Sequence, residues 1–306
     1  MTMRMGFVGL GSLGRHLATS LLRAGFPLTV FDVDEAAAAE LVEAGASWAG
    51  CAAAVARTSD TVITCLPSPA VVTAAVEGPD GILEGLARGG TWIDTSTNDY
   101  HELQRLAALA AELGVSTLES PVTGGVHRAA AGMITVLVGG ERAAFERHRP
   151  VFEAMGGKVF YIGPLGQASK IKVITNMLAF IHLLADAEAL MLAKQGGIDL
   201  ALAWAVIRAS SGNSFVHETE GQLILNGSYN VNFTMDLARK DLGFALQMGR
   251  EFGVPLELAG LTEQLFLRAR ALYGGGAQSP MVARMLEDAV GTDLRAPGFP
   301  AELEPE

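Results

Sequence analysis

A change of pattern near the middle of the chain constrains the fold more than any other feature of the sequence. Up to about Tyr161, short runs rich in β-branched residues alternate with Ala- and Leu-rich stretches of helical spacing. The runs are residues 6–8, 28–31, 61–64, 91–94, 136–138 and 159–162. Strands that alternate with helices predict an α/β fold on a parallel, doubly wound sheet. After Gly163 only amphipathic helical patterns follow, to about Val290, which predicts an all-helical second part.

The length of 306 residues is enough for two domains that each bury a core. We therefore predict a sheet domain over residues 1–163 and an all-helical domain over residues 164–292. Residues 293–306 contain three prolines and several acidic residues without periodicity, and are predicted to form a flexible acidic tail.

Charge and cysteine content narrow the possible partners. A formal net charge of -11 at pH 7 would repel a nucleic-acid backbone or an anionic membrane, so neither is expected as a partner. Cys51 and Cys65 lack the spacing of a disulfide framework or a zinc site, and no metal is expected. The sequence enters its first strand without a secretory hydrophobic segment, which predicts a cytoplasmic protein.

The most apolar segment covers residues 176–193. It is interrupted by His182, Asp186 and Glu188, which a membrane span would have to bury in lipid. The segment is therefore predicted to be a core helix.

A glycine-rich turn follows the first expected strand directly and opens a helix. Its residues are Gly9, Leu10, Gly11, Ser12, Leu13 and Gly14. In this G-x-G-x-x-G pattern the first two glycines permit a tight turn and close backbone approach, and the third lets helix and strand pack. The helix N-terminus then binds the pyrophosphate of a dinucleotide. The pattern predicts a Rossmann-type nucleotide site, since a plain turn would not require all three glycines.

The charges after the second expected strand favour NAD over NADP. Asp32 ends this strand 18 residues after Gly14, where a carboxylate accepts hydrogen bonds from the adenosine ribose. No Lys or Arg occurs at residues 24–56, whereas Asp34 and Glu35 follow at once, so a 2′-phosphate would meet uncompensated negative charge. A plain helix-capping role fits Asp34 better than Asp32.

Two further turns are expected at the carboxyl edge of the sheet, where ligands bind in such folds. They contain Leu66, Pro67 and Ser68, and, after Asp94, Ser96 and Thr97. Either could alone be an ordinary connection between a strand and a helix.

Three other segments carry groups suited to acid chemistry. The loop Thr123, Gly124 and Gly125 has backbone N–H groups that can bind a carboxylate, although it could be a plain turn. Lys172 and Asn176 lie one helical turn apart on an otherwise apolar face, where a surface lysine is the ordinary explanation. A later helix begins near Phe233 and carries Lys240 and Asp241, which could form a surface salt bridge.

In their order and spacing, these segments resemble the β-hydroxyacid dehydrogenases over nearly the whole chain. That family includes 3-hydroxyisobutyrate dehydrogenase, tartronate semialdehyde (2-hydroxy-3-oxopropionate) reductase and sulfolactaldehyde reductase. The resemblance implies an NAD-dependent oxidoreductase that acts on a small hydroxy acid or semialdehyde. It makes Lys172 the catalytic lysine, Asn176 the substrate-orienting amide, Thr123, Gly124 and Gly125 the substrate loop, Phe233 an aromatic residue of the pocket, and Lys240 with Asp241 a pair on the cofactor side.

These roles predict a mechanism. Lys172 accepts the hydroxyl proton as hydride moves to nicotinamide, and its ammonium returns the proton in the reduction. Burial and the cationic nicotinamide are expected to lower the pKa of Lys172. Lys170 points about 200° away on the helix and is not expected to act.

The substrate loop departs from the usual P-V-S-G-G pattern. Thr123 replaces serine, and Val126, His127 and Arg128 follow the glycines. Thr123 keeps the hydroxyl, whereas an inward-pointing Arg128 would add a cation to the pocket. Arg128 could equally be solvated.

Several functions remain open within this frame. The absence of obvious phosphate-binding residues and the apolar residues Val122 and Met177 favour 3-hydroxyisobutyrate. The alternatives are a tartronate semialdehyde or sulfolactaldehyde type of reductase, which Arg128 would favour, and a non-enzymatic dinucleotide-binding module, which Lys172 argues against. Lys172 also disfavours an imine reductase, and Thr175–Met177 disfavours phosphogluconate dehydrogenase. The apolar helical domain predicts a homodimer or homotetramer.

Overall fold

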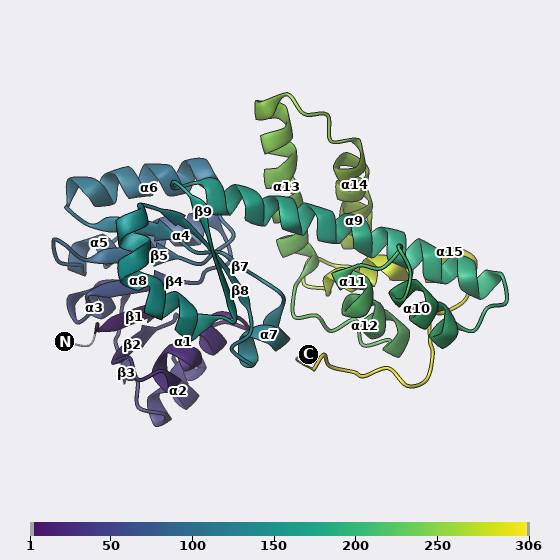
Figure 1. Cartoon of the computed structure of the whole chain (residues 1–306), viewed down its shortest axis with the longest axis horizontal. Coiled ribbons are helices and arrows are strands. Elements are labelled where there is room, and N and C mark those ends of the chain that lie inside the picture. The colour runs from purple at the N-terminus through teal and green to yellow at the C-terminus, as the bar shows by residue number, and fades with distance from the viewer. Residues whose placement is uncertain (1–2, 305–306) are drawn as a thin grey trace. The chain divides into compact units, whose positions relative to one another are not determined.

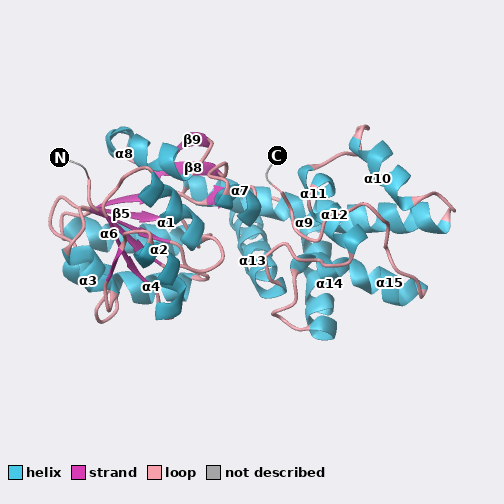
Figure 2. Cartoon of the chain, turned by 90° about the horizontal axis from the view of Figure 1, so that it is seen from below, coloured by secondary structure: helices cyan, strands magenta, loops and turns pink. Residues whose placement is uncertain are grey.

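The computed structural model describes residues 3–304. Contacts between residues divide the chain into two compact units, one running to Lys172 and the other covering Val173–Glu304 (Figure 1). Strands occur in the first unit, whereas the described part of the second is helical (Figure 2). An α/β sheet part followed by a helical part is the predicted fold class.

The first unit is a sheet flanked by helices. Its strands are β1 (Met5–Val8), β2 (Leu28–Phe31), β3 (Ser47–Trp48), β4 (Thr61–Thr64), β5 (Thr91–Asp94), β6 (Ser116–Glu119), β7 (Val122–Thr123), β8 (Thr135–Gly140) and β9 (Lys158–Gly163). Its helices are α1 (Gly14–Arg23), η1 (Glu35–Ala38), α2 (Ala39–Glu43), α3 (Ala52–Arg57), α4 (Pro69–Glu77), α5 (Ile82–Gly85), α6 (Tyr100–Glu112), α7 (Val126–Ala130) and α8 (Arg142–Met155).

Within the described residues the strands form one sheet in the order β3-β2-β1-β4-β5-β6-β8-β7, with β9 paired to β8. Strands β1 to β6 run parallel to one another, as predicted. The sheet is not parallel throughout, because β8 runs antiparallel to β6 and β7. The short loop and helix α7 between β7 and β8 reverse the chain direction, which a full crossover helix would preserve.

The sheet is covered on both faces, which explains why its strands are apolar throughout. Along β1, Phe7 packs in one core and Val8 in another, because successive side chains of a strand point to opposite faces. The first core takes side chains from α1 and α8, such as Leu17 and Phe152. The second takes side chains from α3, α4 and α6, such as Val72.

The parallel strands bring several predicted segments to one edge. The turn at Gly9 follows β1, Asp32 follows β2, Leu66 follows β4 by two residues, and Thr95 follows β5. Because the carboxyl ends of parallel strands meet at the same edge, these segments lie along one border of the sheet.

The second unit consists of helices around a core of its own. They are α9 (Gln167–Gln195), which begins in the first unit, α10 (Leu200–Arg208), α11 (Phe215–Glu218), α12 (Glu220–Asn226), α13 (Met235–Phe252), α14 (Glu257–Tyr273), η2 (Ser279–Ala283) and α15 (Arg284–Val290). The core stripe of α9 contains Phe180, Leu183, Ala187 and Leu190, at the three- and four-residue spacing of one helix face.

The boundary between the units differs from the expected one at residue 163. It falls between Lys172 and Val173, inside α9, because the first turn of this helix is bonded to the sheet unit through Glu119. A single helix of 29 residues thus belongs to both units.

The segment after α15 also differs from the expected flexible tail over residues 293–304. Leu294 is fully buried in the helical core, and Arg295 forms an ion pair with Glu287. Asn226 donates a hydrogen bond to the carbonyl of Phe299. Gly291 ends α15 in the left-handed conformation, and apolar side chains beyond it still pack against the helical core. Residues 305 and 306 of the predicted tail lie outside the described residues.

By length and composition α9 could cross a membrane, as many core helices could. A third of its most apolar window, 33%, is buried within the chain. On this helix the buried Asp186 is hydrogen-bonded to His217 of α11. These contacts favour a helix of a folded domain.

Candidate functional site

The glycine-rich turn has the geometry of a dinucleotide cradle. Gly9 has φ +98°, and a Cβ on it would lie 2.3 Å from the carbonyl oxygen of Cys65. A Cβ on Gly14 would lie 2.0 Å from the carbonyl oxygen of Gly9, so α1 packs closely on the turn. No atom lies within 4 Å of a Cβ placed on Gly11. Two glycines are therefore required by packing, and the third leaves space that a pyrophosphate can approach at the start of α1.

Asp32 and Asp34 have different roles in the structure. The Leu10 N–H donates to Asp32 Oδ2 at 2.6 Å, so this carboxylate holds the glycine-rich turn against the end of β2. The Asp34 carboxylate accepts from Ala36 N–H and caps η1. Asp32 is therefore placed at the nucleotide turn, and the capping role belongs to Asp34.

The turns after β4 and β5 are bonded to each other. The Leu66 N–H donates to Ser96 Oγ at 2.9 Å, and Ser68 caps α4. Below them Asp94 is buried and accepts from Ser96 N–H and Asn98 Nδ2. Burial raises the pKa of Asp94, and these hydrogen bonds oppose that rise. The edge next to the nucleotide turn is thus fixed by internal bonds.

The predicted substrate loop contains two glycines at positive φ, a backbone conformation that residues with a side chain rarely adopt. Thr123 lies on β7, and Gly124 and Gly125 have φ +123° and +87°. His127 and Arg128, two of the residues that depart from the family pattern, border this loop. A Cβ on Gly124 would lie 3.2 Å from Arg128 Cδ, and one on Gly125 would lie 2.9 Å from the His127 ring. Both side chains of α7 therefore lie along the glycines.

Two lysines at the start of α9 have distinct surroundings. Lys172 is largely buried, with 9% of its surface exposed. Lys170 is half-buried, and its Nζ lies 4.4 Å from the centroid of the Tyr100 ring. The Lys170 ammonium is thus engaged in a cation–π contact with an aromatic ring of α6. Lys172, which is buried, is therefore the candidate for proton transfer.

Glu119 is a residue that the sequence analysis did not identify. It ends β6, four residues before Thr123, and its carboxylate bonds to the backbone at the start of α9. Its partners lie 47 to 50 residues further along the chain, so no local sequence signal indicates them.

In the helical unit, the predicted pair Lys240 and Asp241 is joined by Asn176. The Asn176 Nδ2 donates to Asp241 Oδ2 at 2.6 Å, and Lys240 Nζ lies 3.2 Å from Asp241 Oδ1. Asp241 is fully buried, which excludes an ordinary surface salt bridge. The carboxylate therefore fixes the Asn176 amide and the Lys240 ammonium together.

Three other residues singled out for the pocket lie in packed surroundings. The Phe233 ring stacks on Phe180, with centroids 6.0 Å apart, and packs against the helical core. Val122 belongs to a core of the sheet unit, and Met177 packs against the helical core. Because Val122 and Met177 pack in cores, they give no direct argument about the substrate.

A second cluster that the sequence analysis missed lies in the helical unit. His217 Nδ1 is 2.5 Å from Asp186 Oδ1, and His217 Nε2 is 2.9 Å from the Trp204 carbonyl oxygen. Nearby, the Glu220 carboxyl has a buried Oε2 without a hydrogen-bond partner among residues 3–304. Burial and the charge of Asp186 raise the pKa of Glu220 to about 8.

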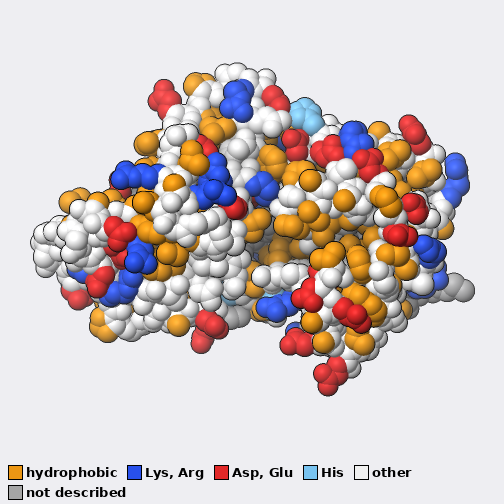
Figure 3. Space-filling view, turned by 180° about the vertical axis from the view of Figure 1, so that it is seen from behind, with side chains coloured by type: hydrophobic (Ala, Val, Ile, Leu, Met, Phe, Trp, Pro, Cys, Tyr) orange, Lys and Arg blue, Asp and Glu red, His pale blue; other side chains and the backbone are white. Residues whose placement is uncertain are grey.

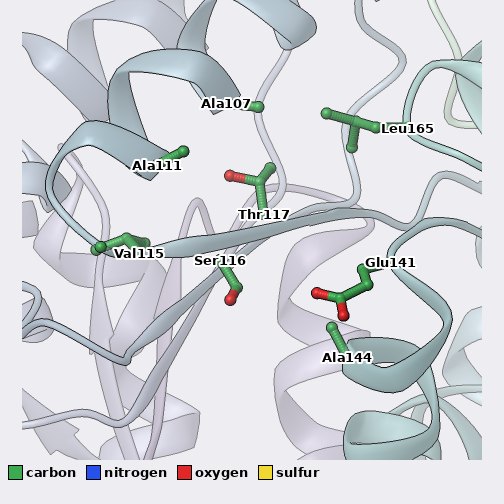
Figure 4. Close-up of a pocket in the computed structure, with 9 residues that line it drawn as sticks. Ala107, Ala111, Val115, Ser116, Thr117, Glu141, Ala144 and Leu165 are labelled. Atoms are coloured by element: carbon green, nitrogen blue, oxygen red, sulfur yellow. The ribbon is translucent and has the colours of Figure 1, made fainter.

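A surface depression of about 410 Å³ lies elsewhere on the sheet unit (Figure 4). It is lined by Ala107, Ala111, Gly114, Val115, Ser116, Thr117, Glu141, Ala144 and Leu165. Ser116 and Thr117 begin β6, so the depression adjoins the opposite end of this strand from Glu119. It is not part of the nucleotide edge.

Two family profiles cover most of the chain. The profile described as the NAD binding domain of 6-phosphogluconate dehydrogenase matches residues 4–163. The profile described as NAD-binding of NADP-dependent 3-hydroxyisobutyrate dehydrogenase matches residues 166–301. Both halves of the chain therefore resemble parts of nicotinamide-dependent dehydrogenases.

Individual proteins give the same result at full length. The chain is 33% identical to 2-(hydroxymethyl)glutarate dehydrogenase of Eubacterium barkeri over 96% of this chain and 98% of that protein. It is 33% identical to mouse mitochondrial 3-hydroxyisobutyrate dehydrogenase over 86% of this chain and 80% of that protein. The structure of Mycobacterium tuberculosis 3-hydroxyisobutyrate dehydrogenase with L-serine matches with a TM-score of 0.84 and 28% identity, over 94% and 99% of the two chains.

Proposed function

Because this chain belongs to the β-hydroxyacid dehydrogenase family, we propose that it exchanges a hydride between NAD and a small 3-hydroxy acid of the 3-hydroxyisobutyrate type. The observation that carries this proposal is the arrangement on α9. Lys172 is largely buried, and Asn176, one turn further, is held by the fully buried Asp241. A buried amine beside a fixed amide suits proton exchange with a hydroxyl or carbonyl oxygen.

Each group of the chain has one task in the reaction. Bound NAD supplies the acceptor for the hydride of the substrate. Lys172, as the free amine, accepts the hydroxyl proton, and as the ammonium it returns a proton to the carbonyl oxygen in the reverse direction. Asn176 orients the reacting oxygen, since Asp241 fixes its amide group. The backbone N–H groups of Thr123, Gly124 and Gly125 bind the substrate carboxylate.

Asp32 supports NAD as the preferred cofactor. Its carboxylate is fixed by the N–H groups of Leu10 and Asp34 at the nucleotide turn. A 2′-phosphate at this position would face its negative charge, and residues 24–56 contain no Lys or Arg to offset it. Binding of NADP more tightly than NAD would contradict this choice.

A second candidate substrate is a 3-hydroxy acid with another anionic group. Arg128 supports it, because its stem lies along Gly124 of the substrate loop. One relative acts on 2-(hydroxymethyl)glutarate, whose name specifies a second carboxylate. Polar acids of the tartronate semialdehyde and sulfolactaldehyde types belong to the same candidate.

Steady-state turnover tests these alternatives. The purified protein is assayed with NAD or NADP against 3-hydroxyisobutyrate, glycerate, serine, threonate, 4-hydroxybutyrate, dihydroxypropanesulfonate and 2-(hydroxymethyl)glutarate. NAD-linked turnover of 3-hydroxyisobutyrate supports the first proposal. A preference of the wild type for a diacid or sulfonate supports the second proposal, provided that Arg128→Ala lowers kcat/KM for that acid by about 10-fold or more. NAD binding without turnover of any acid would support a non-enzymatic module instead.

We further propose a homodimer or homotetramer, supported by apolar side chains at the surface of the helical unit. Leu192 on α9, Leu202 and Val206 on α10, and Leu258 and Leu261 on α14 are all more than half exposed. Hydrophobic side chains also interrupt the charged ones over the face seen in Figure 3. Light scattering should give two or four times 32.0 kDa, and a monomer would contradict the proposal.

The cytoplasm stays the predicted location. Both cysteines, Cys51 and Cys65, are free, which suits a reducing compartment. Fractionation of the source cells tests this prediction.

A further inference from the structure

The Glu119 carboxylate forms an unusually complete set of bonds at the start of α9. Its Oε1 accepts from Gly166 N–H at 2.6 Å and from Ala168 N–H at 2.9 Å. Its Oε2 accepts from Ser169 N–H at 2.9 Å and from the Ser169 hydroxyl. Glu119 and Ser169 are 1% and 2% exposed. All four bonds are therefore shielded from water.

These bonds provide acceptors for the free N–H groups at the start of α9 from a residue that lies outside the helix. The first N–H groups of a helix have no acceptor within it, and a side chain immediately before the helix usually supplies one. Here the acceptor comes from a strand 47 to 50 residues earlier, and its negative charge faces the positive end of the helix dipole. The bonds thus hold α9 to the sheet, as well as stabilising its first turn.

The sheet provides the space that this arrangement needs. Glu119 on β6 is paired with Gly139 on β8. A Cβ on Gly139 would lie 2.2 Å from Glu119 Oε1, so any side chain there would displace the carboxylate. The glycine therefore allows Glu119 to reach the helix.

The bonds connect two parts of the proposed catalytic apparatus. Glu119 lies four residues before Thr123, which begins the proposed substrate loop. Ser169 lies three residues before Lys172, on the neighbouring turn of α9 and close to the same face. The carboxylate thus joins the strand that leads into the loop to the turn that carries the lysine.

We propose that Glu119 is a positioning residue that fixes Lys172 relative to the substrate-binding loop. This inference rests on the proposed role of Lys172 in proton transfer. An error of about 1 Å in the position of a reacting group can cost about 100-fold in rate. Glu119 therefore affects the chemical step without touching the substrate.

The test compares Glu119→Gln with Glu141→Gln in the full-length protein. Gln keeps the size of Glu119 but removes the charge and turns an NH₂ group toward backbone N–H donors. Glu141 is exposed, stands at the start of α8 and makes no capping bond, so it controls for the loss of one acidic charge in the same unit. Ser169→Ala removes only the hydroxyl donor and serves if Glu119→Gln fails to fold.

Two readouts are required. Deuterium exchange should accelerate at the amides of residues 166–169 in Glu119→Gln and not in Glu141→Gln. With the hydroxy acid that the wild type oxidises best, kcat should fall by about 30-fold in Glu119→Gln and about 3-fold in Ser169→Ala. KM and the Kd for NAD should change by less than about 3-fold, because the loop and the nucleotide turn are intact.

The outcomes separate the two proposals. If exchange is faster in Glu119→Gln but kcat, measured at a temperature below the unfolding transition, is unchanged, Glu119 is a purely structural residue. This result would overturn the positioning role and leave the proposed function standing. A fall in kcat accompanied by an equal fall in the affinity for NAD would also overturn the positioning role. A wild-type protein that oxidises no hydroxy acid would overturn the proposed function, and the positioning role with it.

Discussion

Buried carboxylates of the sheet unit and of the helical unit differ in how many hydrogen-bond donors surround them. In the sheet unit, Glu119 and Asp94 accept hydrogen bonds from several backbone N–H and side-chain groups. In the helical unit, Asp186 bonds to a histidine, and Asp186 Oδ2 and Glu220 Oε2 have no hydrogen-bond partner within residues 3–304. Burial raises a carboxyl pKa in both units, but only abundant donors oppose it. Strand ends and helix starts supply such donors, whereas packed helices offer few free N–H groups.

The largest effect that tests this contrast between the two units concerns Glu220. Its pKa is raised from 4.5 to about 8 in the folded state by burial and by the charge of Asp186. The folded protein therefore binds a proton that the unfolded chain has lost, so stability falls as pH rises from about 4.5 to about 8. Gln at this position does not titrate. The advantage of Glu220→Gln over the wild type should grow by on the order of 3 kcal/mol between pH 5 and pH 8.

Urea unfolding at several pH values measures this advantage. The neighbouring titratable groups are Asp186 and His217; burial alone would lower the pKa of His217, but its contact with Asp186 raises it overall. A constant difference between variant and wild type at all pH values would show that Glu220 is ionised throughout. The contrast between the two units would then fail.

The next effect concerns Asp241, a buried carboxylate of the helical unit that has polar partners. Asp241→Asn removes the charge that holds Lys240 and weakens the hold on Asn176. We expect kcat/KM to fall by about 30-fold, because an unfixed amide no longer orients the substrate. Asp236→Asn is the matched control on the same helix, since its bond to Arg270 is half exposed at the surface. Equal activity of the two variants would remove Asp241 from the proposed site.

The smallest effects separate Asp32 from Asp34 in the sheet unit. Asp32→Ala removes the acceptor that holds Leu10 and faces the proposed ribose position, so the Kd for NAD should rise by about 10-fold. Asp34→Ala removes only the cap of η1 and should cost about 1 kcal/mol of stability. Calorimetric titration with NAD distinguishes them. A similar loss of affinity in both variants would contradict the separate roles.

Local patterns were sufficient for the fold class of the first unit and for its nucleotide turn. Gly9, Gly11 and Gly14 belong to one turn, Asp32 follows the next strand, and the structure places the Asp32 carboxylate against that turn. The turns after β4 and β5 were also found from the strands that precede them, and Ser96 joins them. Such features depend on neighbours in sequence, which a pattern can report.

The remaining features depend on partners distant in sequence. Glu119 bonds to α9 47 to 50 residues later, and Glu220 lies beside Asp186, 34 residues earlier in the chain. The reversal of β8 and the packing of Leu294 likewise follow from tertiary contacts. Composition could not indicate them, because the tail residues are polar on average and only a few apolar side chains among them, such as Leu294, pack in the core.

The central claim is that Lys172 exchanges the proton, and Lys170 provides its control on the same helix. Lys172→Ala and Lys170→Ala are compared in NAD-linked oxidation of the acid that the wild type prefers. The account predicts a loss of kcat of about 1000-fold or more in Lys172→Ala with NAD binding retained, and a change below about 3-fold in Lys170→Ala, whose ammonium lies over Tyr100. Retained turnover in Lys172→Ala would contradict the account.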